Sequence, residues 1–218
     1  MTWSRPDPAA SREGYHHGNL RQALIDAAIA LIAERGPGGF SFAEVARAVG
    51  VSPAAPYRHF RDRNALLADI AMRGFELFEA ELIGAWDGGR PEPIGALVRC
   101  GRRYLTFARR QPALYAAMFE SGLPPDTDSG LLRASERAFA VLVRAAEGVC
   151  ANIPPPARPP AIMVALHVWS FAHGIASLFL AHASGPGRVL PMAPEDLLEA
   201  GVLLYLQGLT GKTTAGLG

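Results

Sequence analysis

Apolar residues recur at intervals of three and four along almost the whole chain, and strand-like alternation is almost absent. One face of an α-helix repeats at this interval, so the periodic segments are expected to be helices. Breaks rich in proline and glycine separate these segments at residues 124–125, 154–156 and 184–187. The sequence therefore predicts an all-α fold of about nine helices.

A longer helix and then a short one are predicted near the N-terminus. The first runs from a cap at Asn19 to a stop at Gly36. The second begins at Ser41, whose spacing to Glu44 is that of a capping box, and it ends at Gly50.

A third short helix is predicted to begin at Ser52, with Pro53 at its first position. Pro56 lies deeper, where proline removes a helical hydrogen bond, so we expect an irregular first turn. Phe60 is expected to lock this helix to the core. Asp62 then caps a longer helix that reaches Leu82.

Beyond residue 89 the predicted helices become longer. We expect them at residues 93–109, 111–120, 129–151, 160–183 and 194–209. The chain is thus expected to consist of a three-helix head at residues 1–64, of which 1–14 are flexible, a helical body at residues 65–211 and a flexible tail at residues 212–218.

The formal net charge of +1 argues against a protein that coats nucleic acid by bulk charge, so a polyanion site must be local. Residues 1–63 contain eight arginines and six acidic residues, and Arg58, Arg61 and Arg63 lie together beside one acid. Cys100 and Cys150 have no paired spacing, which favours two unpaired thiols over a metal site or a disulfide framework.

The N-terminus lacks the apolar core of a signal peptide. Residues 161–183 approach the length of a membrane span, but they contain three histidines and many small residues. We therefore expect a buried helix there, and a soluble cytoplasmic protein without a membrane partner.

The two short helices joined at Gly50 have the arrangement of a helix-turn-helix, in which the second helix enters the major groove of DNA. Ala54 and Ala55 would present methyl groups to base or sugar edges, and Tyr57, His59 and the nearby arginines would reach phosphates. An ordinary helical hairpin with a charged rim explains the same pattern, so both interpretations stay open at this point.

The run from Tyr15 to Leu67, including YHHGNLRQALIDAA, GFSFAEVARAVGVS and YRHFRDRNALL, resembles the DNA-binding domain of TetR-like bacterial transcriptional regulators. The resemblance implies a helix-turn-helix that binds double-stranded DNA, with Ser41 and the backbone N–H of Phe42 at phosphates. It also implies that Ala54, Ala55 and Tyr57 face the DNA groove, and that His59 and Arg63 contact the DNA backbone. The implied DNA-binding residues are Ser41, Phe42, Ser52, Ala54, Ala55, Tyr57, Arg58, His59 and Arg63.

At Pro56 the sequence departs from the family, which mostly has an apolar residue other than proline there. The arm formed by Tyr15, His16 and His17 would add a phosphate or minor-groove contact, or it is a frayed, solvated arm. Repression is the usual outcome in this family.

The segment Trp169 to Gly174 is similar to the pattern of a WHG-type C-terminal subgroup of this family, whose body helices form an effector pocket and a dimer interface. The apolar and aromatic candidates suit a small hydrophobic or aromatic effector, although the same residues could simply form a core. The pocket candidates are Tyr104, Phe107, Tyr115, Met118, Phe119, Phe139, Trp169 and His173.

The last two predicted helices carry small and branched residues that would let two copies pack as a four-helix interface. These interface candidates are Ala165, Ala172, Ala176, Leu180, Leu197, Leu198, Val202 and Leu206. A two-fold homodimer would read a palindromic operator with two heads, which multiplies the discrimination between sequences. Effector binding would tilt the helix that follows Asp62 and separate the heads.

No catalytic motif is evident, and no enzyme activity, cofactor or metal is expected. Residues 208–214 resemble a phosphate-binding loop but fail on spacing, so we interpret them as tail. A rival class is a helical small-molecule carrier or enzyme that uses the face of Trp169 and His173.

Overall fold

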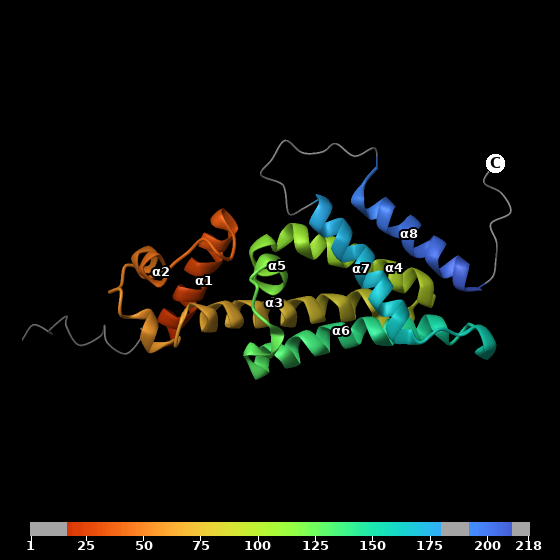
Figure 1. Cartoon of the computed structure of the whole chain (residues 1–218), viewed down its shortest axis with the longest axis horizontal. Coiled ribbons are helices and arrows are strands. Elements are labelled where there is room, and N and C mark those ends of the chain that lie inside the picture. Colours follow the sequence, from red (N-terminus) through yellow and green to blue (C-terminus); the bar gives the residue numbers. More distant parts are fainter. Residues whose placement is uncertain (1–16, 180–191, 211–218) are drawn as a thin grey trace, which may run out of the picture.

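The computed structural model describes residues 17–179 and 192–210. Within these ranges it contains eight α-helices and no strand, which confirms the all-α prediction (Figure 1). The helices are α1 (His17–Arg35), α2 (Phe42–Val49), α3 (Arg63–Trp86), α4 (Pro93–Arg110), α5 (Pro112–Phe119), α6 (Ser129–Cys150), α7 (Ala161–Phe179) and α8 (Pro194–Thr210).

The ninth expected α-helix, the one predicted to begin at Ser52, is instead a short 3₁₀ helix, η1 (Pro56–Arg58). The bounds of the other helices agree with the prediction to within a few residues, although α3 continues past Leu82 to Trp86. α1 begins two residues earlier than predicted, so Asn19 lies inside the helix and is not its cap. The expected flexible ends, the Tyr15–His16 arm and Leu180 lie outside the described residues.

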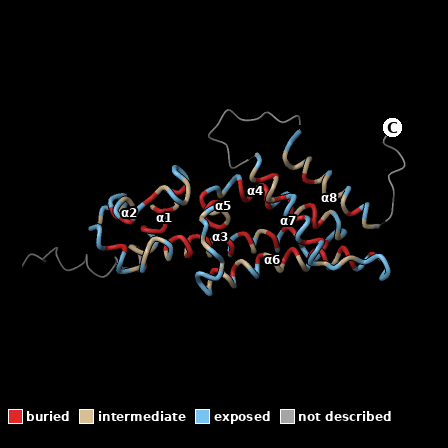
Figure 2. The backbone as a smooth tube through the Cα atoms, viewed as in Figure 1, coloured by how far each residue is buried: buried red, intermediate tan, exposed pale blue. Residues whose placement is uncertain are grey.

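A small head and a larger body share the long helix α3 (Figure 1). The head consists of α1, α2 and η1, and it lies at the N-terminal end of α3. In the body, α3 packs on α6, α4 and α5, while α7 and α8 pack on α4. Figure 2 shows buried residues running along α3 from head to body, and the buried side chains of both parts form one cluster.

The bounds of α2 follow from its caps. The N–H of Glu44 donates to Ser41 Oγ at 3.3 Å, and the N–H of Ser41 donates to Glu44 Oε2 at 2.9 Å. This is the predicted capping box, which satisfies two backbone donors at the helix start. Gly50 then ends the helix with a left-handed conformation at φ 77°.

An ion pair and a side-chain hydrogen bond fix the head on α3. The Arg21 guanidinium of α1 donates to Asp69 Oδ1 at 2.6 Å, and within α3 itself Arg73 Nε lies 3.2 Å from Asp69 Oδ2. Arg73 also donates to the side chain of Gln22 at 2.7 Å. Because Asp69 is largely buried between two cations, loss of one partner would leave a charge poorly compensated.

α7 is long and apolar enough to cross a membrane by length and composition. In the structure it packs against α4, α6 and α8, with Val164, Val168 and Ile175 buried. It therefore occupies the place of a bundle helix.

A close approach between α3 and α5 occurs at Gly74. A Cβ atom at this position would lie 2.6 Å from Met118 Sδ and 3.4 Å from Leu114 Cβ. The same helix has a second glycine, Gly84, with no atom within 4 Å of such a Cβ. The two glycines of α3 therefore differ in whether a side chain would fit: there is room for one at Gly84 but not at Gly74.

We expect opposite effects when each of these glycines is replaced by alanine. Gly84→Ala should raise the free energy of unfolding by up to about 1 kcal/mol, because alanine favours helix. Gly74→Ala should lower it by about 1 kcal/mol, because overpacking against Met118 outweighs that gain. Urea unfolding followed by circular dichroism at fixed protein concentration measures both. An equal gain in both variants would contradict the close contact.

Candidate functional site

The segment after α2 forms a tight turn in place of an α-helix. The N–H of Ala55 donates to Ser52 O at 2.9 Å, and the N–H groups of His59 and Phe60 both donate to Pro56 O at 3.0 Å. Pro56 has no N–H to donate back to Ser52, so the chain tightens to 3₁₀ geometry. The irregular turn expected from the proline is present, and it replaces the whole helix.

The structure places most of the predicted contact residues on the surface of the head. Tyr57 is 63% exposed, and its ring packs edge-on against Phe42 with centroids 4.9 Å apart. Ser41, Ser52, Ala54 and Arg58 are exposed, and His59 is half-buried.

Two of the predicted contact residues, Phe42 and Ala55, have buried side chains. The Ala55 methyl therefore lies inside the head and is not presented to a groove. The backbone N–H of Phe42, at the start of α2, is the part of that residue that the DNA-binding prediction uses.

Arg63 braces the head internally. Its Nε donates to Phe40 O at 3.0 Å, and another guanidinium nitrogen donates to Pro37 O. The guanidinium lies 4.6 Å from the centroid of the Phe40 ring. Arg63 thus ties the loop between α1 and α2 to the start of α3, which makes it a positioning residue for the head surface.

The exposed surface around η1 has a small positive excess. Arg61 forms an ion pair with Asp62 at 2.9 Å, and Asp62 also caps α3 by accepting the N–H of Ala65. The pKa of Asp62 is lowered by that backbone hydrogen bond and by Arg61. Among the described residues Arg58 has no ion-pair partner, so its charge is available to an anion.

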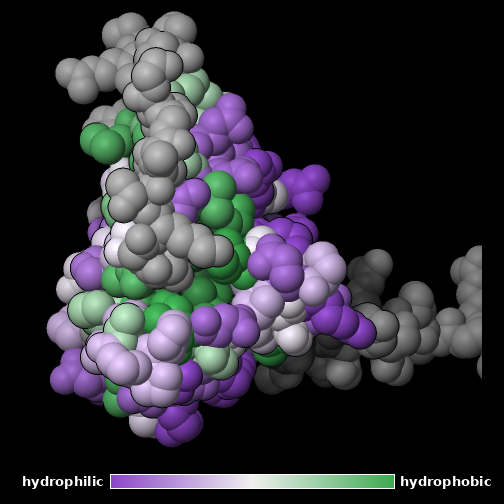
Figure 3. Space-filling model, turned by 90° about the vertical axis from the view of Figure 1, so that its right-hand side faces the viewer, coloured by the Kyte–Doolittle hydropathy of each residue, from purple (hydrophilic) through white to green (hydrophobic). Residues whose placement is uncertain are grey.

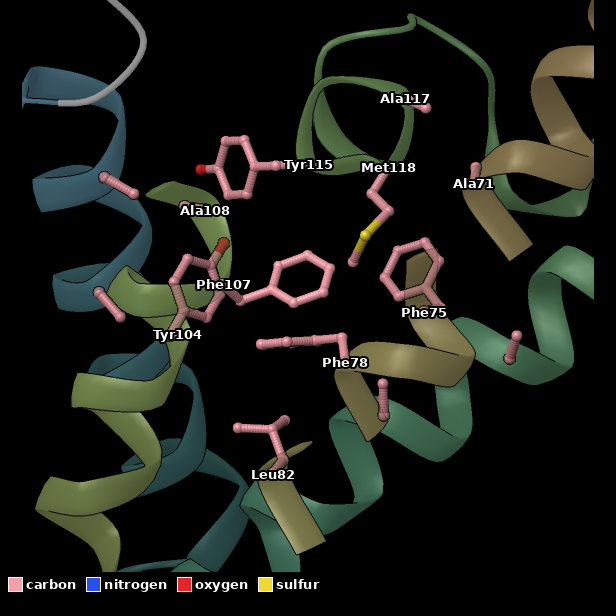
Figure 4. Close-up of a cluster of buried hydrophobic side chains, with 14 of the residues drawn as sticks. Ala71, Phe75, Phe78, Leu82, Tyr104, Phe107, Ala108, Tyr115, Ala117 and Met118 are labelled. Carbon is pink, nitrogen blue, oxygen red and sulfur yellow. The ribbon is translucent and has the colours of Figure 1, made fainter. Parts of the chain in front are cut away.

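The body contains a cavity of about 320 Å³ between α3, α5, α6 and α7. Figure 4 shows Phe75 and Phe78 of α3 reaching toward Met118 of α5 and Tyr104 of α4. The cavity is lined by Phe75, Phe78, Met118, Phe119, Ser135, Glu136, Ala138, Phe139, Leu142 and Trp169.

The predicted pocket residues fall into two groups. Met118, Phe119, Phe139 and Trp169 line the cavity. Four others form an aromatic cluster next to it: Tyr104, Phe107, Tyr115 and His173.

Of the residues that α3 and α6 contribute to the cavity wall, sequence reasoning found only Phe139 of α6. Phe75 and Phe78 are three residues apart, and Ser135, Ala138 and Leu142 follow a helical spacing that places them on one face. That spacing was the available signal. It predicts a shared face, but it does not show that the two faces meet around a void.

His173 is the polar centre of the neighbouring cluster. Its Nδ1 lies 2.8 Å from the Tyr104 hydroxyl and 3.1 Å from the Tyr115 hydroxyl. Burial lowers the pKa of His173 and raises the pKa values of Tyr104 and Tyr115. All three side chains are therefore uncharged near neutral pH.

Most of the interface residues predicted on α7 and α8 lie in the interior of the monomer where the structure describes them. Ala165, Ala172 and Ala176 pack inside the bundle, as do Leu198, Val202 and Leu206, while Leu197 is half-buried. The exposed apolar residues of the same two helices are Ile162, Met163, Leu166, Phe171, Leu178 and Leu204. Figure 3 views the molecule from the end where α8 finishes and shows apolar surface between polar areas.

Within residues 17–179 and 192–210, no group of three or more His, Cys, Asp or Glu side chains is placed to hold a metal ion. Cys100 and Cys150 are both buried and unpaired. Burial raises the pKa of the Cys100 thiol to about 12, which makes it a poor nucleophile at neutral pH.

Comparisons with known proteins agree with this arrangement. Residues 24–70 match the family described as bacterial regulatory proteins, tetR family, and residues 97–204 match the tetracyclin repressor-like C-terminal domain. The HTH-type transcriptional regulator BetI of Rhizobium meliloti (strain 1021) is 29% identical over 101 residues, which cover 45% of this chain and 50% of BetI. The match thus spans half the length of that curated relative.

Solved structures share the fold over most of the chain. A protein of unknown function from Rhodococcus sp. RHA1 is 30% identical, with a TM-score of 0.75, and the match covers 91% of this chain and 99% of that one. The TetR-family regulator PfmR from Thermus thermophilus is 20% identical, with a TM-score of 0.63 and coverages of 89% and 98%. AibR, solved in complex with isovaleryl coenzyme A and operator DNA, is 19% identical with a TM-score of 0.62 and coverages of 85% and 97%.

The helix-turn-helix head and the helical body define a DNA-binding transcriptional regulator. This chain belongs to the TetR family of bacterial regulatory proteins, a class of generally non-enzymatic proteins, as its sequence resemblance had indicated.

The half-buried His173 gives a prediction for how the stability of the fold depends on pH. Because its pKa is lower in the folded protein, the unfolded chain binds more protons once the pH falls below about 6.5. Stability that is present above that pH is then lost as the pH falls toward the folded-state pKa. We expect the unfolding temperature to fall between about pH 7.5 and pH 5.5, and His173→Gln to reduce this fall.

The matched control is His167→Gln, because His167 lies on the same helix with an exposed side chain. The control should keep the full pH dependence in a thermal scan followed by circular dichroism. Identical curves for the two variants would contradict a special role of the buried imidazole.

Proposed function

We propose that this protein is a cytoplasmic, ligand-responsive transcriptional repressor. It binds a palindromic operator as a homodimer and is released by a small hydrophobic or aromatic effector. The observation that carries the proposal is the double role of α3. Its N-terminal end adjoins the exposed head surface, and Phe75 and Phe78 farther along the same helix line the aromatic cavity.

The head surface supports a DNA contact. Tyr57 and Arg58 project from the tight turn, and Ser41 stands at the N-terminus of α2, where backbone N–H groups favour a phosphate. Ser52, Ala54 and His59 complete the proposed contact surface. The Ala55 side chain is left out of it because it is buried.

The cavity supports control by an apolar effector. Its volume of about 320 Å³ and its aromatic lining suit a small organic molecule. AibR, which has a similar fold, was solved with both a coenzyme A thioester and operator DNA. That precedent supports a body that holds a small molecule and a head that holds DNA in one chain.

Release from DNA requires that the effector bind better to the DNA-free arrangement than to the DNA-bound one. Occupancy of the cavity presses on Phe75 and Phe78 of α3. The ion pair of Asp69 with Arg21 and the hydrogen bond from Arg73 to Gln22 then carry a movement of α3 to the head. In the homodimer this movement changes the distance between the two heads.

The dimer contact is proposed on the exposed apolar face of α7 and α8. Leu178 is 69% exposed and Leu204 is 58% exposed, and Phe171, seven residues before Leu178, lies on the same face of α7. Large apolar side chains in such number on two adjacent helices are typical of a surface that is covered by a partner. Two such faces related by a two-fold axis would form a four-helix interface.

The DNA contact is tested with Arg58→Ala. DNA fragments retained from genomic DNA by the purified protein supply the probe. We expect about ten-fold weaker binding at low salt, because one phosphate contact per protomer is lost, and a salt slope reduced by about 1 per protomer. Electrophoretic mobility shifts at several salt concentrations measure both quantities.

Arg110→Ala serves as the matched control, since Arg110 is exposed at the end of α4 in the body. It should bind DNA as the unchanged protein does. Equal weakening by both substitutions would attribute the effect to overall charge, and retention of no DNA by the unchanged protein would overturn the proposal.

The dimer contact is tested with Leu204→Glu, which places a carboxylate in the proposed interface. Burying an unpaired charge is costly, so we expect monomers in sedimentation velocity at concentrations where the unchanged protein is dimeric. The matched control is Leu77→Glu on the exposed face of α3, which should remain dimeric. A dimeric Leu204→Glu protein would place the interface elsewhere.

A further inference from the structure

The chemistry of the cavity wall narrows the class of effector. Five aromatic side chains contribute to the wall, from four different helices: Phe75, Phe78, Phe119, Phe139 and Trp169. Phe75 meets Phe119 edge to face, with centroids 5.5 Å apart, and Phe139 meets Trp169 at 5.7 Å. Because these rings are tilted relative to one another, they present both faces and edges to the space between them.

Among the described residues that line the cavity, Glu136 is the ionisable one. It is exposed at the mouth of the cavity, and no hydrogen bond or ion pair joins it to the described part of the chain. The adjacent cation, Arg137, is held by Glu79 at 3.0 Å and by Glu76 at 3.8 Å. The carboxylate of Glu136 is therefore available to a ligand.

No cationic side chain lines the cavity in the described part of the chain. His173, in the neighbouring aromatic cluster, is hydrogen-bonded to Tyr104 and Tyr115, and burial lowers its pKa. Glu120, which follows α5, is close enough to influence both His173 and Tyr115 electrostatically. With Arg137 paired to Glu79 and Glu76, the unpaired charge at the cavity is that of Glu136.

This balance disfavours an anionic ligand. A carboxylate or phosphate inside the cavity would lose its hydration without gaining a cationic partner, and it would face the carboxylate of Glu136. Binding of a cation is favoured in two ways. The aromatic faces attract ammonium groups, and Glu136 supplies the counter-charge.

We propose that the effector is a small organic cation, an amine or quaternary ammonium with an aromatic or alkyl body. Its ammonium group lies between Glu136 and the rings, and its apolar body fills the space beside Phe75 and Phe78. The inference rests on the proposed effector role of this cavity, and it adds the sign of the ligand's charge. An acyl-coenzyme A of the kind bound by AibR would not fit this charge pattern.

Three compounds of similar shape and different charge test the inference. They are phenylpropyl-trimethylammonium, the neutral phenylpropanol and the anionic phenylpropanoate. Titration calorimetry with the purified full-length protein measures their affinities. We expect the cation to bind at least about ten-fold more tightly than the anion, with the neutral compound between them.

Three variants locate the residues responsible for the selectivity. Glu136→Gln should weaken binding of the cation about five-fold and leave the neutral compound within about two-fold. Glu147→Gln, which removes an exposed carboxylate farther along α6, should change neither. Ala138→Phe should abolish binding of all three, because Ala138 lines the cavity and a larger side chain would fill it.

Operator release is measured with the same compounds, so that the two proposals can fail separately. If all three compounds bind equally or the anion binds best, and DNA is released, the repressor proposal stands and the cation inference is overturned. If the cation binds selectively through Glu136 but leaves DNA binding unchanged, the cation site stands and the regulatory role fails. If Glu136→Gln has no effect, the assignment of the counter-charge is overturned.

Discussion

The ion pair of Asp69 on α3 with Arg21 on α1 is the interaction on which the relation of head to body depends. Together with the hydrogen bond from Arg73 to Gln22, it ties α1 of the head to a helix whose next turns form the cavity wall. The close approach of α3 and α5 at Gly74 adds a second constraint, because it leaves no space for a side chain between them. In the proposed mechanism, a signal that begins at the cavity would reach the head through one well-packed helix and one largely buried carboxylate.

Most of the helices could be predicted because their bounds depend on local signals. The box of Ser41 with Glu44, the left-handed Gly50 and the Asp62 cap act within a few residues of sequence, and each is present in the structure. The helix expected after Ser52 is the exception. There the missing N–H of Pro56 outweighed the favourable cap and the helical spacing, and a single 3₁₀ turn resulted.

The functional surfaces could be predicted only in part, because they depend on which helices meet. Periodicity identifies apolar stripes, but α7 has two of them. The stripe with Ala165 and Ala172 faces the chain's own core, and the stripe with Phe171 and Leu178 faces outward. The interface prediction selected the first stripe, whereas the proposed interface uses the second, since small residues allow close packing equally well within one chain and between two. The cavity residues of α3, and those of α6 other than Phe139, were missed for a related reason, because a void between helices has no local sequence signal.

The 3₁₀ turn at Pro56 has a consequence for how operators would be chosen. A DNA-contacting segment of a single 3₁₀ turn offers few side chains to the bases, chiefly Tyr57 and Arg58. Each half-site would therefore contribute little to sequence discrimination. Selection among genomic sites would then rest on the separation and symmetry of the half-sites more than on the identity of individual bases. Promoters recognised by such a protein would share a strict spacing between half-sites and tolerate considerable variation in base sequence.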